Sequence, residues 1–248
     1  VLNPRNIWLM VVLIVGISIL GYFIYKWQGK DKGMISNGIL GGIISSTATT
    51  VSYAKTTKSN KGLNRTSAFV ILAAVTVSLI RVIVEIAVVI PEKLTEIIFP
   101  FIVYFAFMAV LTVILFYKTS EEKQGDEMPE PKNVAQFKTA LVFGLLYGLV
   151  LLAVAFTEDK FGESGLYIVS VIGGLAKKDA IVLSLAYSIE NGLDVSLGWR
   201  LIMTGVLANF AFKILIVALV GSRRLTKVMG VVLSASVIVG ILIMVIWP

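Results

Sequence analysis

The chain has 248 residues, of which 57% are hydrophobic, and a formal net charge of +7. Soluble domains are about 45–50% apolar, and a chain of this length cannot bury such an excess against itself, so lipid must solvate much of its surface. Cysteine and histidine are absent, which excludes disulfides, thiolate chemistry, imidazole bases and soft metal sites. Any divalent cation would need oxygen ligands. The positive charge gathers in short loops between apolar runs, which is typical of orientation against anionic lipid and does not indicate nucleic acid.

Eight apolar runs follow one another along the chain, and six have the length of a membrane-spanning helix, about 20 residues. These six lie at 7–27, 67–90, 97–117, 137–157, 199–220 and 226–247. The other two, at 33–54 and 165–188, carry glycine pairs and polar residues at mid-length, which does not suit a regular helix in lipid. The runs together predict an all-α, polytopic integral membrane protein.

The second run, at 33–54, carries the pair Gly41 and Gly42 followed by a cluster of hydroxyl side chains. A helix break at the glycines would free backbone amides and carbonyls, and the hydroxyls would add oxygen ligands, so the segment could strip water from an ion. The alternative is that the hydroxyls bond back to their own helix and pack against neighbours. The cluster consists of Ser45, Ser46, Thr47, Thr49 and Thr50.

The third run contains two opposite charges, Arg81 and Glu85, which are four residues apart and therefore share one helix face. The seventh run contains Lys213 with Asn209 at the same spacing. We interpret both as intramembrane pairs, which either compensate charge between packed helices or take part in gating and substrate contact.

The segment 118–136 is charged, contains proline and has no hydrophobic periodicity. We interpret it as a solvent-exposed linker between a first membrane repeat, 1–117, and a second, 137–248.

The sixth run, at 165–188, carries a second glycine pair, Gly173 and Gly174, followed by three charged residues. Ionisable groups at membrane depth indicate a functional site by default. The aspartate is the better cation ligand, whereas the lysines favour an anion or a gate. The alternative is an Asp–Lys pair that locks the segment, with the second lysine reaching towards water. The three charges are Lys177, Lys178 and Asp179.

Residues 11–54 align without a gap on 143–186, at a constant offset of 132 residues, with nine identities that include four glycines. The same offset places Arg81 on Lys213 and one glycine pair on the other. Two copies of one unit are the architecture of many transporters and channels, whose sites lie where the copies meet.

Positive charges decide between two topologies. With eight full transmembrane helices, the loops carry ten lysines and arginines on one side and eight on the other, which gives no orientation. If 33–54 and 165–188 each enter and return on the same side, the partition is fourteen against four, as the positive-inside rule requires. We therefore expect two inverted repeats, each of three transmembrane helices plus one re-entrant or broken helix. The alternative is eight full transmembrane helices.

Two segments resemble a known membrane family, GILGGIISSTATTVSYA at 38–54 and GGLAKKDAIVLSLA at 173–186. They are similar to the C-terminal membrane domain of MgtC/SapB-like proteins, a domain of unknown function, and the resemblance covers nearly the whole chain. It implies a role in magnesium homeostasis or another ion function, and an MgtC-type membrane domain as a partner.

The predicted function is a membrane ion transporter or channel, with a cation such as magnesium as a candidate substrate. The two glycine-pair segments would form the selective region at the bilayer midplane, with Asp179, Ser46 and Thr47 as metal ligands. The alternatives are a non-transporting regulator of ion homeostasis that acts through protein partners, and an anion channel. No nucleophile–base pair, carboxylate dyad or phosphate loop is present in the sequence, so we predict neither an enzyme nor a cofactor. The expected location is a prokaryotic inner membrane, with the positively charged loops in the cytoplasm. The sequence is also compatible with a homo-oligomer.

Overall fold

The computed structural model describes residues 3–27, 33–119 and 137–247, which form α-helices and two short 3₁₀ helices. In chain order the elements are α1 (Pro4–Trp27), α2 (Met34–Ser59), η1 (Lys61–Leu63), α3 (Asn64–Val89), η2 (Pro91–Lys93), α4 (Leu94–Thr119), α5 (Phe137–Glu190), α6 (Val195–Val220) and α7 (Arg223–Ile246). The all-α prediction is therefore confirmed. Of the predicted linker, residues 118 and 119 end α4, and 120–136 lie outside the described residues.

Six stretches of these helices are long and apolar enough to cross a membrane, and they match the six predicted spans. Large apolar side chains on their outer faces are exposed, among them Leu20 of α1 and Val231 of α7. Exposed apolar surface on this scale needs a lipid environment. The chain is a polytopic membrane protein. The six stretches are Pro4–Trp27, Asn64–Val89, Pro91–Thr119, Ala140–Thr157, Val195–Val220 and Arg223–Ile246.

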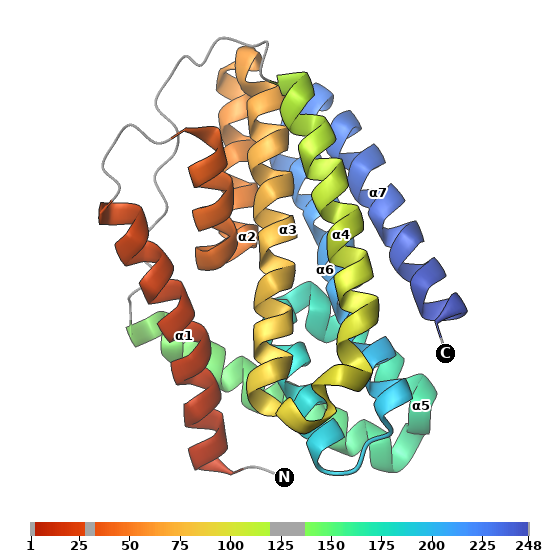
Figure 1. Ribbon diagram of the computed structural model, residues 1–248. Coiled ribbons are helices and arrows are strands. Elements are labelled where there is room, and N and C mark those ends of the chain that lie inside the picture. The colour runs from red at the N-terminus through yellow and green to blue at the C-terminus, as the bar shows by residue number, and fades with distance from the viewer. Residues whose placement is uncertain (1–2, 28–32, 120–136, 248) are drawn as a thin grey trace.

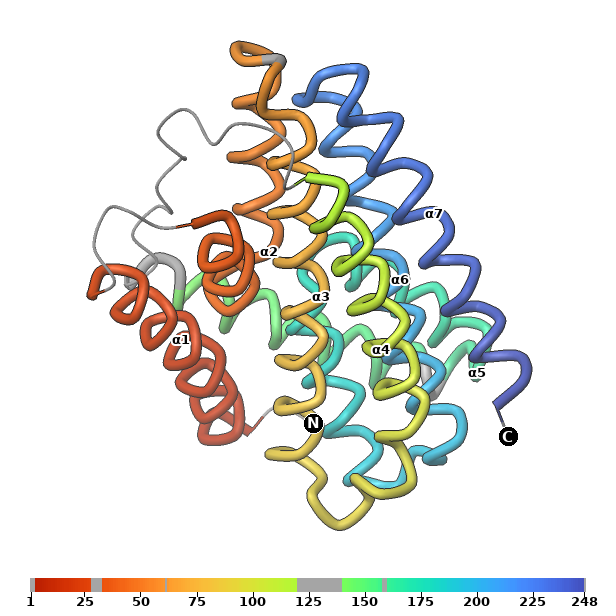
Figure 2. Tube along the Cα trace, turned by 45° about the horizontal axis from the view of Figure 1, so that its top comes forward, coloured from red at the N-terminus to blue at the C-terminus, as the bar shows by residue number. Residues whose placement is uncertain are grey.

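Two of the six helices form the centre of the bundle. The apolar stretch of α3 is 78% buried and that of α6 is 67% buried, against 22–28% for the other four. Packing of α2 against α3 and of α5 against α6 covers these central helices, while α1 and α7 lie at opposite edges (Figure 2). The charged residues at mid-length of these helices, Arg81 and Glu85 on α3 and Lys213 on α6, are held inside the protein.

Corresponding helices of the two halves run in opposite directions. From its first residue, α3 descends the bundle and α4 ascends it, whereas α6 ascends and α7 descends (Figure 1). In the second half, α5 starts beside α1, crosses the bundle and turns back towards its centre. The arrangement brings helices of both halves together in the middle of the molecule.

Neither α2 nor α5 is a continuous helix. The backbone of α2 is extended at Ser45, with φ −169° and ψ 102°, and that of α5 is extended at Lys177, with φ −159° and ψ 104°. These positions are 132 residues apart, which is the offset of the sequence repeat. A further bend in α5 lies at Gly162, whose φ of 59° favours glycine. The predicted runs 137–157 and 165–188 therefore belong to one bent element.

At each break the chain folds back on itself. A Cβ atom built on Gly41 would lie 2.6 Å from Oγ1 of Thr49, and one built on Gly173 would lie 3.0 Å from Cβ of Ile181. Both contacts join residues eight positions apart, which a straight helix would separate by about 12 Å along its axis. The first glycine of each pair therefore leaves room for the returning half of its own helix.

Candidate functional site

Both breaks line one partly open cavity of about 340 Å³. Its wall combines the turn of α2 after Gly42, the turn of α5 after Ala176, and side chains from the central helices α3 and α6. The polar and charged side chains on this wall are Ser45, Ser46, Thr47, Ser78, Arg81, Lys177, Lys178, Asp179 and Asn209. The cavity thus gathers most of the site residues that the sequence predicts from both halves.

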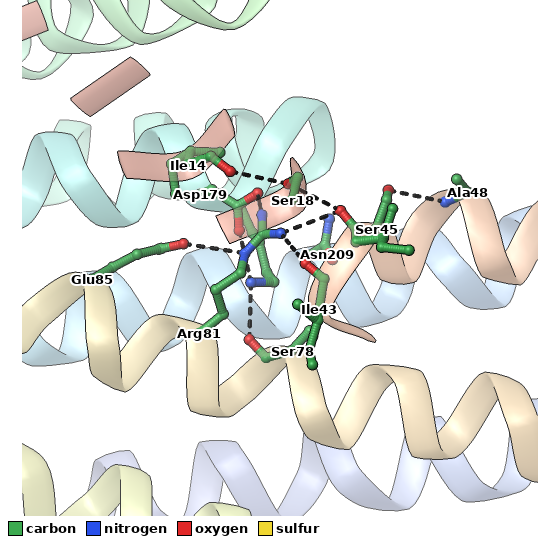
Figure 3. Close-up of polar contacts among 12 residues, drawn as sticks. Ile14, Ser18, Ile43, Ser45, Ala48, Ser78, Arg81, Glu85, Asp179 and Asn209 are labelled. Atoms are coloured by element: carbon green, nitrogen blue, oxygen red, sulfur yellow. Dashed lines mark hydrogen bonds and ion pairs between the residues drawn. The ribbon is translucent and has the colours of Figure 1, made fainter. Parts of the chain in front are cut away.

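Arg81 holds the end of the first half of α2. Its Nη1 donates hydrogen bonds to the backbone oxygens of Ile43 and Ile44, at 3.1 and 3.4 Å, and its Nη2 donates to Asp179 (Figure 3). The Nε atom lies 3.4 Å from Oε1 of Glu85, so the predicted pairing partner is in place. Arg81 and Glu85 are both buried. The guanidinium thus caps carbonyls that the break leaves without helical partners.

Asp179 accepts hydrogen bonds from two cationic side chains. While Arg81 donates to its Oδ2, Nζ of Lys178 lies 2.9 Å from its Oδ1 and also donates to the backbone oxygen of Ser78 at 3.1 Å. All three charged side chains are buried, and they tie α5 to α3. The predicted Asp–Lys lock exists, with Arg81 as an additional partner from the other half.

The corresponding helix end in α5 is capped by α6. Nδ2 of Asn209 donates to the backbone oxygen of Gly174 at 3.0 Å, and Nζ of Lys213 donates to Oδ1 of Asn209. Lys213 is fully buried, with its Nζ atom 5.5 Å from the ring centre of Phe210. The pairing of Asn209 with Lys213, which the spacing of four residues predicts, is therefore present as a hydrogen bond.

The five hydroxyls of α2 divide into two groups. Thr49 and Thr50 donate back to the backbone oxygens of Ser45 and Ser46, at 2.9 and 2.7 Å, as the alternative interpretation predicts. Ser45, Ser46 and Thr47 line the cavity. The Ser45 side chain accepts from the backbone amide of Ala48 at 3.3 Å, and so it caps the second half of α2.

Lys177 of α5 forms no hydrogen bond or ion pair with the described residues. Nζ of Lys177 lies 5.4 Å from the ring centre of Phe143, a cation–π contact with the first part of α5. Its side chain is half-buried and lines the cavity. Lys177 is therefore the cation of this site that is most available to a ligand.

Two serines of the site are missing from the sequence prediction. Ser78 offers its backbone oxygen to Lys178, and Ser18 of α1 donates to the backbone oxygen of Ile44 at 3.2 Å. Ser78 precedes Arg81 by three residues and shares its helix face, so helical spacing could have indicated it. Ser18 carries no such signal, because its contact depends on how α1 packs against α2.

The predicted metal ligands lie on one wall, but their geometry does not resemble a metal centre. Within the described residues there is no group of three or more acidic, histidine or cysteine side chains that could hold a metal ion. Asp179 lines the same cavity as Ser46 and Thr47, and both of its oxygens already accept from cationic side chains. A magnesium site at Asp179, Ser46 and Thr47 stays a prediction.

Comparison with known proteins places the site inside a recognised domain. A family model described as "Domain of unknown function (DUF4010)" matches residues 12–221, a range that contains both breaks and the whole cavity wall. An "Uncharacterized protein" of Aquifex aeolicus (strain VF5) is 26% identical over 201 residues, which are 81% of this chain and 87% of that protein. No solved structure matches the chain. The association with an MgtC-type partner stays a prediction.

Proposed function

The chain belongs to the DUF4010 family, whose description assigns no activity, and we propose from its site that it is a membrane transporter or channel for a small ion. The ion passes through the cavity between the two broken helices. In this proposal each half is one inverted repeat, with three membrane-spanning helices and one broken helix that enters and leaves on the same side.

The observation that carries the proposal is the pair of matched breaks. Ser45 and Lys177 interrupt their helices at equivalent positions of the repeat, in halves that run in opposite directions, and both open onto one cavity. Broken helices that meet between inverted repeats form the substrate sites of many secondary transporters. Packing alone would be achieved at lower cost by apolar helices, because irregular backbone and buried charges destabilise a membrane protein unless they are compensated.

The cavity wall also supplies what ion passage requires. Hydroxyls, backbone groups and charged side chains can replace the water shell of an ion, and α3 and α6 hold them away from lipid. Movement of one half against the other would open the cavity to alternate sides, with the Arg81–Asp179 contact among those that must change.

Ion flux in proteoliposomes tests the proposal. The purified chain, reconstituted into vesicles, should move at least one ion from a panel of sodium, potassium, magnesium, chloride, nitrate and sulfate salts faster than protein-free vesicles do. The double change Ser46→Ala with Lys177→Gln should reduce that flux, whereas Ser52→Ala with Lys227→Gln, which changes side chains outside the cavity wall, should not. Absence of flux for every salt would reject transport and favour the regulator of ion homeostasis.

A further inference from the structure

We infer that the ion bound in the cavity is a small inorganic anion, held by the amino-terminal end of the second half of α2 together with Lys177. The inference deepens the proposed function, since it names the substrate class of the same site. It rests on the helix ends, the donor groups and the charge balance of the cavity wall.

The two halves of each broken helix differ in how their ends are satisfied. The carbonyl ends, which carry partial negative charge, are capped by side chains: Ile43 and Ile44 accept from Arg81, and Gly174 accepts from Asn209. Such carbonyls are ligands that a cation could use. At these three residues they already accept from protein donors.

The residues at the amide ends line the cavity, 45–48 in α2 and 177–179 in α5. The second half of α2 covers residues 46–59 and the last part of α5 covers 178–190, so each has several turns and a positive amino-terminal end. Ser45 satisfies one amide, that of Ala48, while the first amides of a helix have no partner within the helix itself. Such amides bind anions.

A hydroxyl without a protein partner marks the same place independently. Ser46 is 5% exposed as a residue and lines the cavity, and its hydroxyl has no hydrogen-bond partner among the residues that the structure describes. The neighbouring hydroxyl of Thr47 is likewise uncommitted within that part of the chain. Both hydroxyls can therefore donate to a ligand in the cavity.

The charges of the wall decide between anion and cation. Three positive side chains, Arg81, Lys177 and Lys178, and one negative side chain, Asp179, line the cavity, and the carboxylate of Glu85 lies outside the wall, 3.4 Å from Arg81, so positive charge is in excess. Both oxygens of Asp179 accept from Arg81 and Lys178, while Lys177 forms no hydrogen bond or ion pair with the described residues and contacts the ring of Phe143. Free ammonium, amide and hydroxyl donors in one cavity suit a ligand that only accepts hydrogen bonds.

Thermal unfolding of the purified chain in detergent tests the anion site. With sodium gluconate as the reference salt at constant ionic strength, sodium chloride, nitrate or sulfate should raise the Tm with increasing concentration, because a ligand of the folded state stabilises it. In Lys177→Gln the anion concentration for half of the effect should rise at least tenfold, and in Ser46→Ala it should rise several-fold. The matched changes Lys227→Gln, at an exposed lysine, and Ser52→Ala, in the same half-helix, should leave it unchanged.

Two results would overturn the inference. One is stabilisation by magnesium gluconate with none by the three anions. The other is an anion effect of equal strength in the parent, Lys177→Gln and Ser46→Ala, each shown to be folded by its unfolding transition in gluconate. The flux assay separates this inference from the proposed function: flux of cations alone would overturn the anion and retain transport. Anion binding that depends on Lys177, without flux of any salt, would retain the anion site and reject transport.

Discussion

Asp179 is the residue on which the contact between the two halves depends most. It accepts from Arg81 of the first half and from Lys178 of its own, and all three side chains are buried. Breaking a buried ion pair by removing one partner is costly, because the remaining charge stays buried without compensation. Neutralising Asp179 removes the carboxylate partner of two buried cations, Arg81 and Lys178. Neutralising Glu85 affects Arg81 alone, whose Nε lies 3.4 Å from the Glu85 carboxylate.

We predict that Asp179→Asn destabilises the protein by about 3–5 kcal/mol and that Glu85→Gln destabilises it by clearly less. Thermal unfolding in detergent, with the two variants compared in one buffer, measures the difference. The exposed change Glu163→Gln serves as the control and should be close to neutral. Equal effects of Asp179→Asn and Glu85→Gln would show that Arg81 does not depend on Asp179 more than on Glu85.

At the scale of the elements, the two glycines of each pair have different roles. The first glycine accommodates the returning half of its own helix, as the contact between Gly41 and Thr49 shows. The second glycine lets the broken helix approach the next helix: a Cβ atom on Gly42 would lie 2.7 Å from the backbone oxygen of Ala74, and one on Gly174 would lie 2.2 Å from that of Gly205. The breaks are therefore held against α3 and α6 by backbone contact.

We predict that Gly174→Ala destabilises the protein by at least about 1–3 kcal/mol, the usual cost of overpacking, because the Cβ meets backbone that cannot move aside. The matched change is Gly148→Ala in α5, where a Cβ would have no atom within 4 Å. It should be neutral or stabilising by about 0.5–1 kcal/mol, since alanine favours a helix more than glycine does. Unfolding temperatures of the two variants in detergent test the contrast. A Gly174→Ala variant as stable as Gly148→Ala would contradict the close approach of α5 and α6.

The sequence predicts elements better than it predicts the site. The spans at 67–90 and 199–220, and the breaks after the glycine pairs, are local features of composition, so the chain displays them directly. The pairs of Arg81 with Glu85 and of Asn209 with Lys213 follow from helical spacing. The contact of Arg81 with Asp179 joins residues 98 positions apart. No spacing rule predicts that contact, because it arises only when α3 packs against α5.

At the scale of the whole molecule, basic residues gather at one end of the bundle. Lys58 donates to the backbone oxygen of Leu219 at 3.2 Å, which joins the end of α2 to the end of α6, and Arg65 donates to that of Lys118 at 3.4 Å, which joins the start of α3 to the end of α4. At the opposite end, Lys93 donates to the backbone oxygen of Ile189 at 3.1 Å. These contacts agree with the grouping of loops that underlies the partition of fourteen charges against four.

We predict that the end with Lys58 and Arg224 faces the cytoplasm and that the end with Lys93 faces outwards. Single cysteines at these positions, in a chain without native cysteine, should react with an impermeant reagent from outside only at position 93. Lys30 and Lys123 lie outside the described residues and are predicted on the cytoplasmic side. If cysteines at 30 and 58 react from opposite sides, the α2 segment crosses the membrane completely and eight transmembrane helices are present.

The contact between Arg81 and Asp179 also bears on how the residues of the two halves correspond. At the repeat offset, Asp179 corresponds to Thr47 and Arg81 corresponds to Lys213. In a pair of two first halves, Arg81 would face Thr47 of the other copy. In a pair of two second halves, Asp179 would face Lys213, whose side chain is shorter than that of an arginine. Only one first half and one second half restore the observed contact. With these residues, the contact in the middle of the molecule requires one copy of each half, and the two halves are not interchangeable.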